Sequence, residues 1–334
     1  MRKLSKIEIR NYARTLVPIL ESHEIDGIKD ARIVDAIVSY SMKGIKPWYR
    51  RGSALQGFPA SPSYNPMRVI EGYLIYPIPG LSPVVIQSSL LGNVYLLLDI
   101  VGAGGGGGGG SSNGQGGGGG ADGGRLIVMT QGPFPTGTQF IPAFGGPGGK
   151  GTPIPSSGCN NGGNDPGPSG NTQVILTGGS NSITVPGGSN PSMPAPPSGY
   201  CAGGLGGPGG SAVFTYLNNT SIFSTIQLLP RVLPNANANV NTQNGGLGIG
   251  SEYFDPTNSS PIFISNPLGT VVKGGTPGST GSSGGPGQSA TVAVPSGAIP
   301  LRGSGGGGGG GGGQISGGNG GPGGPGPIIV LVID

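Results

Sequence analysis

Apolar residues recur at helical spacing close to the N-terminus of the chain. Ser5 and Glu8 have the spacing of a capping box, which predicts the start of a helix. Pro18 lies inside the pattern and predicts a kink or an early end. A second helix is expected over about 29–43. The apolar face of the first helix consists of Ile9, Ala13, Leu16, Val17 and Leu20.

Short apolar runs bounded by glycine or proline predict the strands of the chain. Such runs occupy residues 68–76, 94–101, 125–130 and 327–334. Runs of this length that are rich in valine, isoleucine and leucine are typical of strands buried in a sheet. We therefore expect a mainly β or irregular fold, in which the run at 327–334 pairs with other strands.

Glycine is concentrated in the same part of the chain as most of these runs. Only seven of the 76 glycines lie in the first 100 residues, and unbroken glycine runs occupy 104–110, 116–120 and 305–313. Disordered linkers are usually poor in β-branched and aromatic residues, whereas strongly apolar segments stand close to these runs. We interpret the runs as packed connections inside a folded domain. A flexible linker is the alternative.

A glycine run can pack as a polyproline-II helix. This helix has three residues per turn, rises about 3.1 Å per residue and makes no internal hydrogen bonds, so its backbone groups must bond outward. When every residue is glycine, such helices can lie side by side and exchange N–H···O and Cα–H···O contacts. Collagen is excluded, because a Gly-X-Y register never persists beyond five triplets.

Charge divides the chain into a basic N-terminal part and a nearly neutral remainder. Residues 1–51 hold 11 of the 17 basic residues, while residues 101–334 hold five basic and five acidic ones. Together with the glycine distribution, this predicts a mostly helical head with a Pro-rich connector at 1–80 and a glycine-rich body at 81–334. Two short helices bury too little surface for an independent core. We therefore expect a partner, or further copies of the chain, to complete the head.

The chain lacks the residue sets of most enzymes and metal sites. His23 is its single histidine, no pair of acids stands out in the glycine-rich part, and there is no Cys-x-x-Cys motif. We expect no enzymatic activity, no cofactor and no metal site. The two cysteines, Cys159 and Cys201, either form a disulfide or are two unrelated thiols. No apolar stretch is long enough to span a bilayer, and the N-terminus lacks the apolar core of a secretion signal.

One short motif recurs along the glycine-rich part. Gly-Gly-Pro-Gly-Gly stands at 145–149, 206–210 and 320–324, with a partial copy at 284–287. Together with the strand at 94–101, the glycine runs and the final strand, this order resembles the glycine-rich domains of bacteriophage tail-fibre tip adhesins. The resemblance implies a small attachment head followed by a sandwich of β-strands and polyglycine-II helices, whose variable loops contact the host receptor.

Isolated aromatic residues are the candidate receptor contacts, because rigid aromatic side chains give a large contact area at low entropic cost. They are Phe134, Phe140, Phe144, Tyr200, Tyr253 and Phe254. The alternative is that these rings fill small cores at the ends of the sandwich. In the head, we favour docking to a fibre, spike or shell protein over contact with nucleic acid or a membrane surface. The candidate attachment residues are Trp48, Tyr49, Arg50 and Arg51.

These observations predict a virion protein at the particle surface or tail tip, which forms a homo-oligomer and binds a protein or glycan receptor on the host cell. The missing secretion signal fits a protein that is assembled inside the host and leaves it with the particle. The alternative is a purely structural virion or cell-surface component without a specific receptor. An ice-binding protein is disfavoured, since the interruptions at 228–233 and 235–244 break any flat, regular face.

Overall fold

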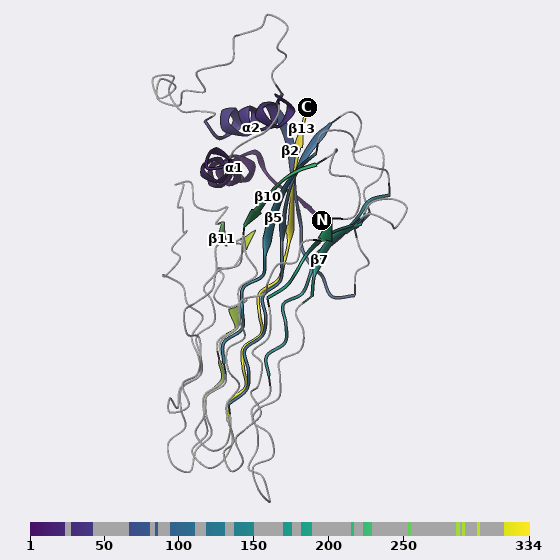
Figure 1. Ribbon diagram of the computed structural model, residues 1–334. Coiled ribbons are helices and arrows are strands. Elements are labelled where there is room, and N and C mark those ends of the chain that lie inside the picture. Colours follow the sequence, from purple (N-terminus) through teal and green to yellow (C-terminus); the bar gives the residue numbers. More distant parts are fainter. Residues whose placement is uncertain are drawn as a thin grey trace, which may run out of the picture.

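The chain is mainly β in the part that the structure describes, with two helices and three sheets. The structure is a computed structural model that describes residues 1–23, 28–42, 67–80, 84–85, 94–110, 118–130, 137–149, 170–175, 182–188, 215–216, 223–228, 253–254, 285–287, 289–290, 299–300 and 317–334. The helices lie at one end, and glycine-rich segments extend from the strands toward the other end (Figure 1).

Helix α1 (Lys6–Glu21) begins as its sequence predicts. The Ser5 hydroxyl accepts a hydrogen bond from the backbone N–H of Glu8 at 3.3 Å, and the Glu8 carboxylate accepts one from the backbone N–H of Ser5 at 2.7 Å. An early end at Pro18 is wrong, because the helix continues to Glu21. The backbone N–H of Ser22 donates to the Pro18 carbonyl at 3.1 Å and extends the bonding past the proline.

Six strands form the first sheet, and all neighbours pair antiparallel. Four of these strands are the apolar runs predicted from the sequence, each confirmed to within two residues. The last of them, β13, lies in the interior of the sheet, which confirms that it pairs with other strands. In spatial order the strands are β1 (Arg2–Lys3), β2 (Val69–Ile75), β13 (Ile328–Ile333), β4 (Tyr95–Val101), β5 (Arg125–Thr130) and β10 (Phe223–Leu228).

A second antiparallel sheet contains five shorter strands and faces the first sheet. A buried apolar cluster joins the two, with Leu98 and Val330 from the first sheet and Phe140 and Val174 from the second. A separate strand pair is formed by β11 (Tyr253–Phe254) and β12 (Ile299–Pro300). The order of the second sheet is β3 (Val84–Val85), β6 (Gln139–Ile141), β7 (Thr172–Ile175), β8 (Ser182–Val185) and β9 (Thr215–Tyr216).

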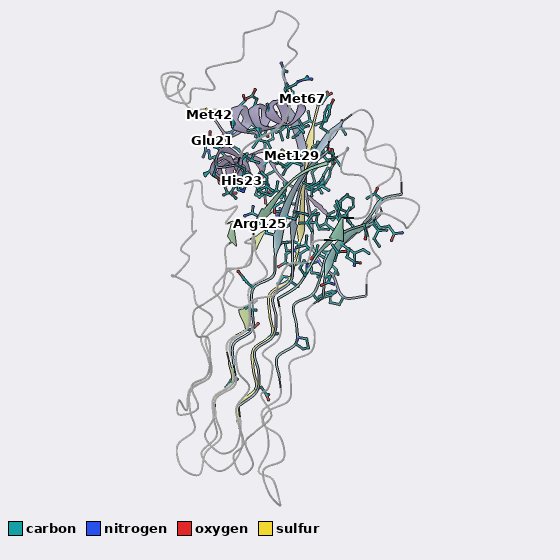
Figure 2. The ribbon with its side chains drawn as sticks, viewed as in Figure 1. Glu21, His23, Met42, Met67, Arg125 and Met129 are labelled. Atoms are coloured by element: carbon teal, nitrogen blue, oxygen red, sulfur yellow. The ribbon has the colours of Figure 1, made fainter. Side chains whose placement is uncertain are left out.

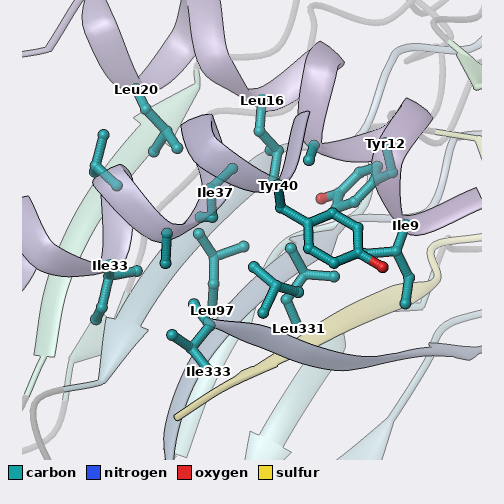
Figure 3. Packing of buried hydrophobic residues seen from close by; sticks show 14 of the residues in the cluster. Ile9, Tyr12, Leu16, Leu20, Ile33, Ile37, Tyr40, Leu97, Leu331 and Ile333 are labelled. Atoms are coloured by element: carbon teal, nitrogen blue, oxygen red, sulfur yellow. The ribbon is translucent and has the colours of Figure 1, made fainter. Parts of the chain in front are cut away.

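Helices α1 and α2 (Ile28–Ser41) cover the opposite face of the first sheet. Leu16 and Ile37 from the helices lie over Leu97 and Leu331 from the strands (Figure 3). The central strands are therefore buried on both faces, which gives three layers: helices, first sheet and second sheet. Burial on both faces is also why these strands are continuous apolar runs and do not alternate with polar residues.

The boundary predicted near residue 80 does not divide this fold. Strands β1 and β2 belong to the same sheet as β4, β5 and β13, and the helices share one apolar core with that sheet. The described helices therefore have their core completed by the chain itself, which corrects the expectation that a partner or further copies complete it. The expectation failed because local sequence shows how little two helices bury, and the sheet that covers them comes from residues far along the chain.

Candidate functional site: the glycine tracts and their base

Several glycine-rich segments are direct continuations of strands, and the others lie beside these continuations. Tract A continues β4, tract B leads into β5, tract D continues β8, and tract F leads into β13. In Figure 1 such segments run side by side away from the helices. Within the described residues, we name these segments tract A (102–110), tract B (118–124), tract C (143–149), tract D (186–188), tract E (285–287 and 289–290) and tract F (317–326).

Tracts A and B are joined by backbone hydrogen bonds at every third residue. The partner number falls by three as the donor number rises by three, so the two tracts run in opposite directions. This spacing leaves two thirds of tract A to face other neighbours. At 2.7, 2.9 and 2.8 Å, the N–H groups of Gly102, Gly105 and Gly108 donate to the carbonyls of Gly124, Ala121 and Gly118.

Tract F bonds tract A with the same spacing, but through other residues of tract A. The carbonyls of Gly104 and Gly107 also accept hydrogen bonds from tract C, and the carbonyl of Ala103 accepts one from tract D. Tract A therefore contacts four other tracts, and all of its residues are buried. Its donors to tract F are Gly104, Gly107 and Gly110, which bond Gly324, Gly321 and Gly318 at 2.8, 2.9 and 2.8 Å.

Tracts C, E and F are joined in the same way. Tract E bonds tract F, since Gly287 and Ala290 donate to the carbonyls of Asn319 and Pro322 at 2.8 and 2.9 Å. The six tracts thus form one array held by main-chain hydrogen bonds, which we call the glycine array. Between tracts F and C, the N–H groups of Gly320, Gly323 and Gly326 donate to Gly149, Gly146 and Ala143 at 2.8, 2.8 and 2.9 Å.

The tracts approach one another so closely that only glycine fits at the contacts. A Cβ atom built on Gly320 would lie 1.9 Å from the carbonyl oxygen of Gly107, and real Cβ atoms essentially never approach another heavy atom within 3.0 Å. Among the described glycines, only Gly80 and Gly137 have a positive φ, and both lie outside the tracts. The tracts therefore require glycine because of close approach, and not because of a left-handed backbone conformation.

In tracts C and F the two solvent-exposed residues are three positions apart. The exposed residues are Phe144 and Pro147 in tract C, and Asn319 and Pro322 in tract F. The glycines between each pair are buried or half-buried. The two fully described copies of the Gly-Gly-Pro-Gly-Gly motif, at 145–149 and 320–324, therefore place their proline where the tract faces outward, and their glycines where the tract contacts its neighbours.

A buried polar cluster is centred on Arg125, the first residue of β5, where this strand meets tract B (Figure 2). The guanidinium of Arg125 donates two hydrogen bonds to Asp99, from Nε to Oδ1 at 2.8 Å and from Nη2 to Oδ2 at 2.6 Å. The Tyr12 hydroxyl of α1 donates to the same carboxylate. At most 1% of each of these residues is exposed. Burial raises the pKa of Tyr12 well above its usual value, and the charge of Asp99 raises it further, so the hydroxyl keeps its proton.

This cluster was not among the sites predicted from the sequence, although the sequence contains a signal for it. Asp99 interrupts the apolar run of β4, and Arg125 begins the apolar run of β5. Charged residues are almost never fully buried unless they are paired. Two opposite charges in neighbouring buried strands therefore indicate an ion pair. The local sequence does not contain the antiparallel register, in which Val101 lies opposite Arg125.

Replacing Tyr12 with Phe is expected to lower the free energy of unfolding by about 1.5–3 kcal/mol, because a buried hydrogen bond to an ionised carboxylate is lost. Urea denaturation followed by circular dichroism measures the change. Tyr76→Phe is the matched control, since Tyr76 is 37% exposed and its loss is expected to stay within about 0.5 kcal/mol. Equal stability of the two variants would contradict an anchoring role for the Tyr12 hydroxyl.

The aromatic candidates for receptor contact fall in different environments. Phe140 lies in β6 and is fully buried between the two sheets. It is a core residue, which corrects its assignment to a contact loop. Phe144 is 49% exposed. Only the backbone of Tyr253 and Phe254 is described, as strand β11. The two other candidates, Phe134 and Tyr200, lie outside the described residues.

The attachment residues and both cysteines also lie outside the described part of the chain, together with the glycine run at 305–313. Their predicted roles stay predictions. The residues concerned are Trp48, Tyr49, Arg50, Arg51, Cys159 and Cys201.

Comparison with models of known protein families and with curated proteins finds no match to this chain. In the described ranges, no helix combines the length and the apolar character needed to cross a membrane. Nor do three or more His, Cys, Asp or Glu side chains gather there in a group that could hold a metal ion. The glycine array and the buried cluster of Tyr12, Asp99 and Arg125 are therefore the features from which a function can be inferred.

Proposed function

We propose that this chain is a viral structural protein at the tip of a tail fibre or spike, where it binds a host cell-surface receptor through loops carried on a polyglycine-II scaffold. The observation that carries the proposal is the hydrogen bonding of tract A, whose N–H groups bond tract B through one set of residues three apart and tract F through another. A scaffold of this kind is stiff, narrow and almost free of side chains. These properties suit a part that presents loops at a distance from the particle.

A polyglycine-II sandwich accounts for the period of three. A polyproline-II helix has three residues per turn, so residues three apart point in the same direction. Tract A bonds tract B through one such set and tract F through another. At a rise of about 3.1 Å per residue, tract A would span about 28 Å. Because each helix lacks internal hydrogen bonds, the lateral bonds hold both its conformation and its place in the array.

The scaffold is suited to displaying a binding surface, and recognition would lie in the connections between its tracts. Inner tracts offer no side chains for a specific contact, whereas loops on a rigid scaffold often carry function. Hydrogen bonds place Gly108 beside Gly118 and Gly110 beside Gly318. Each of these glycines lies toward the end of its tract that is far along the chain from the adjoining strand, and the tracts extend away from the helices (Figure 1). We assign the connections at that end to the receptor side, and Phe144, whose neighbour Ala143 bonds Gly326 close to β13, would contact the receptor from the flank of the array near the sheets.

Phe144 is the described residue best suited to a receptor contact. Its carbonyl accepts a hydrogen bond from Gly170 at 3.2 Å, and the adjacent Ala143 exchanges two hydrogen bonds with Gly326 at 3.0 and 2.9 Å. The exposed ring therefore stands on a fixed backbone and would lose little entropy on binding. We propose Phe144 as a contact together with Phe134, Tyr200, Tyr253 and Phe254.

The helical end of the molecule would attach the chain to the particle. In this proposal Trp48, Tyr49, Arg50 and Arg51 dock onto a fibre, spike or shell protein. The chain acts as a homo-oligomer exposed on the virion, without enzymatic activity and without a cofactor. Attachment at one end and display at the other match the elongated arrangement of helices, sheets and tracts (Figure 1).

Cell binding tests the receptor role. The fluorescently labelled full chain is expected to bind cells of the virus host, and pre-incubation with the unlabelled chain is expected to lower adsorption of the virus. Phe144→Ala should weaken both effects. Ile7→Ala is the matched control, because Ile7 is an apolar residue that is 52% exposed and belongs to α1, outside the tracts.

The alternative, a purely structural component, predicts a different result. Immunogold electron microscopy would then show the chain on particles, while the purified chain neither binds cells nor competes with the virus. Particles without label would overturn both virion versions of the proposal and leave a structural cell-surface component.

A further inference from the structure

The inner tracts of the glycine array associate through bare backbone. Tract A is composed of glycine apart from Ala103, and it contacts four other tracts. At these contacts the space for a side chain is absent, as a Cβ atom on Gly106 would lie 2.1 Å from the carbonyl oxygen of Pro147. An N–H group, a carbonyl and an empty Cβ position are therefore sufficient for one tract to bind another.

The outer positions of tracts C and F lack this combination. Pro147 and Pro322 are both exposed and follow the same period as the hydrogen bonds. Proline has no N–H group to donate, and its ring occupies the space that an approaching backbone would need. The Pro322 carbonyl is already bonded within the chain, by the N–H of Ala290 at 2.9 Å. The outward face of each tract therefore presents a ring where the inner tracts present a bare peptide group.

We infer that Pro147 and Pro322 keep the outer face of the glycine array from binding a glycine tract of a second copy of the chain. The inference goes beyond the proposed function and does not depend on it. The same problem arises at the edge of a β-sheet, where unpaired backbone groups recruit further strands and proline is one of the residues that block them. Glycine at both positions would expose a bare peptide group on the outward face of each tract, next to the side chains of Phe144 and Asn319, which remain there.

Sedimentation velocity on the full chain with Pro147→Gly and Pro322→Gly tests this inference. The double variant is expected to form larger species whose share rises with protein concentration, whereas the parent keeps one distribution over the same range. The single variant Pro322→Gly is measured alongside and is expected to associate at higher concentrations than the double variant. This keeps the test decisive if the double variant does not fold.

Two controls separate the mechanism from a general effect of losing proline. Pro79→Gly removes an exposed proline from a turn outside the tracts and is expected to sediment as the parent does. The double variant Pro147→Ala with Pro322→Ala gains the N–H groups, as the glycine variant does, but each alanine keeps a Cβ atom. This methyl group holds a second tract away, so no association is expected. The inference is overturned if the folded glycine variants sediment as the parent does, or if the alanine variant associates equally well.

Discussion

Removing residues 327–334 is expected to abolish cooperative folding of the helices and both sheets. Strand β13 lies between β2 and β4, so it supplies the backbone hydrogen bonds that join β1 and β2 to the rest of the first sheet. Its six side chains are at most 6% exposed. Burial of each is worth about 1.5–3 kcal/mol, so the strand contributes on the order of 10 kcal/mol, which is comparable to the net stability of a typical domain.

Urea denaturation followed by circular dichroism measures this effect. Removal of residues 1–3 is the matched control, because it deletes the edge strand β1, whose two residues are exposed. Its two ion pairs, Arg2 with Glu8 and Lys3 with Glu71, lie at the surface, where such pairs contribute about 0–1 kcal/mol each. A cooperative transition in the chain without β13, at a denaturant concentration near that of the parent, would contradict the central role of this strand.

Gly323→Ala is expected to separate tracts A and F and to destabilise the glycine array. A Cβ atom at this position would lie 2.1 Å from the carbonyl oxygen of Gly104. The clash is with backbone, so no side-chain rotation relieves it and the tracts must move apart. The hydrogen bonds from Gly104 to Gly324 and from Gly323 to Gly146 would then be lost. Each buried bond broken in this way costs about 1–3 kcal/mol, which gives an expected loss of about 2–6 kcal/mol.

Hydrogen exchange measured by mass spectrometry on peptides from tracts A and F locates the effect, and the thermal midpoint gives its size. Pro322→Ala is the matched control, since it introduces the same residue at the neighbouring, exposed position. Its expected cost is about 0.4–1 kcal/mol, from the greater freedom of the unfolded chain. If the two variants exchanged at equal rates in tract A, the tracts would not be in the close contact described above.

The elements of this fold could be predicted from the sequence, because local patterns carry the information. The capping box at Ser5 and Glu8 marks the start of α1, and the continuous apolar runs mark strands buried on both faces. The neighbours of those strands could not be predicted. Strand β13 pairs with β2, more than 250 residues earlier in the chain. No local pattern specifies such a pairing.

Charge gave a misleading domain boundary for a physical reason. Charged side chains mark surfaces that face water, and the described helices have such a surface, whereas the described glycine tracts are bonded mainly to one another. The change of composition near residue 80 therefore reflects exposure and not separate folding. The helices and the sheet share one apolar core across it.

For the candidate site, the packing of glycine backbones could be predicted from the sequence, but which aromatic side chains are buried and which are exposed could not. The glycine runs suggested close packing of backbones, and the hydrogen bonds of tract A agree with that interpretation. Phe140 and Phe144 stand four residues apart in one Pro-rich segment, yet one is buried and the other exposed. Pairing of β6 with β7 sets Phe140 opposite Val174 and so points it into the core. The register of that pairing depends on distant residues.

Strands β4 and β5 continue directly into tracts A and B, so the same two chain segments are paired with two different periods. Strands β4 and β5 repeat every two residues, because side chains alternate between faces, while tracts A and B repeat every three. If β4 and tract A slid by two residues along β5 and tract B, the side chains of the strands would keep their faces but the hydrogen bonds between the tracts would be lost. A shift of three residues would restore the hydrogen bonds between the tracts and turn the strand side chains to the wrong face. A shift that satisfies both the period of two and the period of three must be a multiple of six residues, and six residues is the whole length of β5. The strand pair alone and the tract pair alone would each allow several registers. Joined end to end, they allow only one.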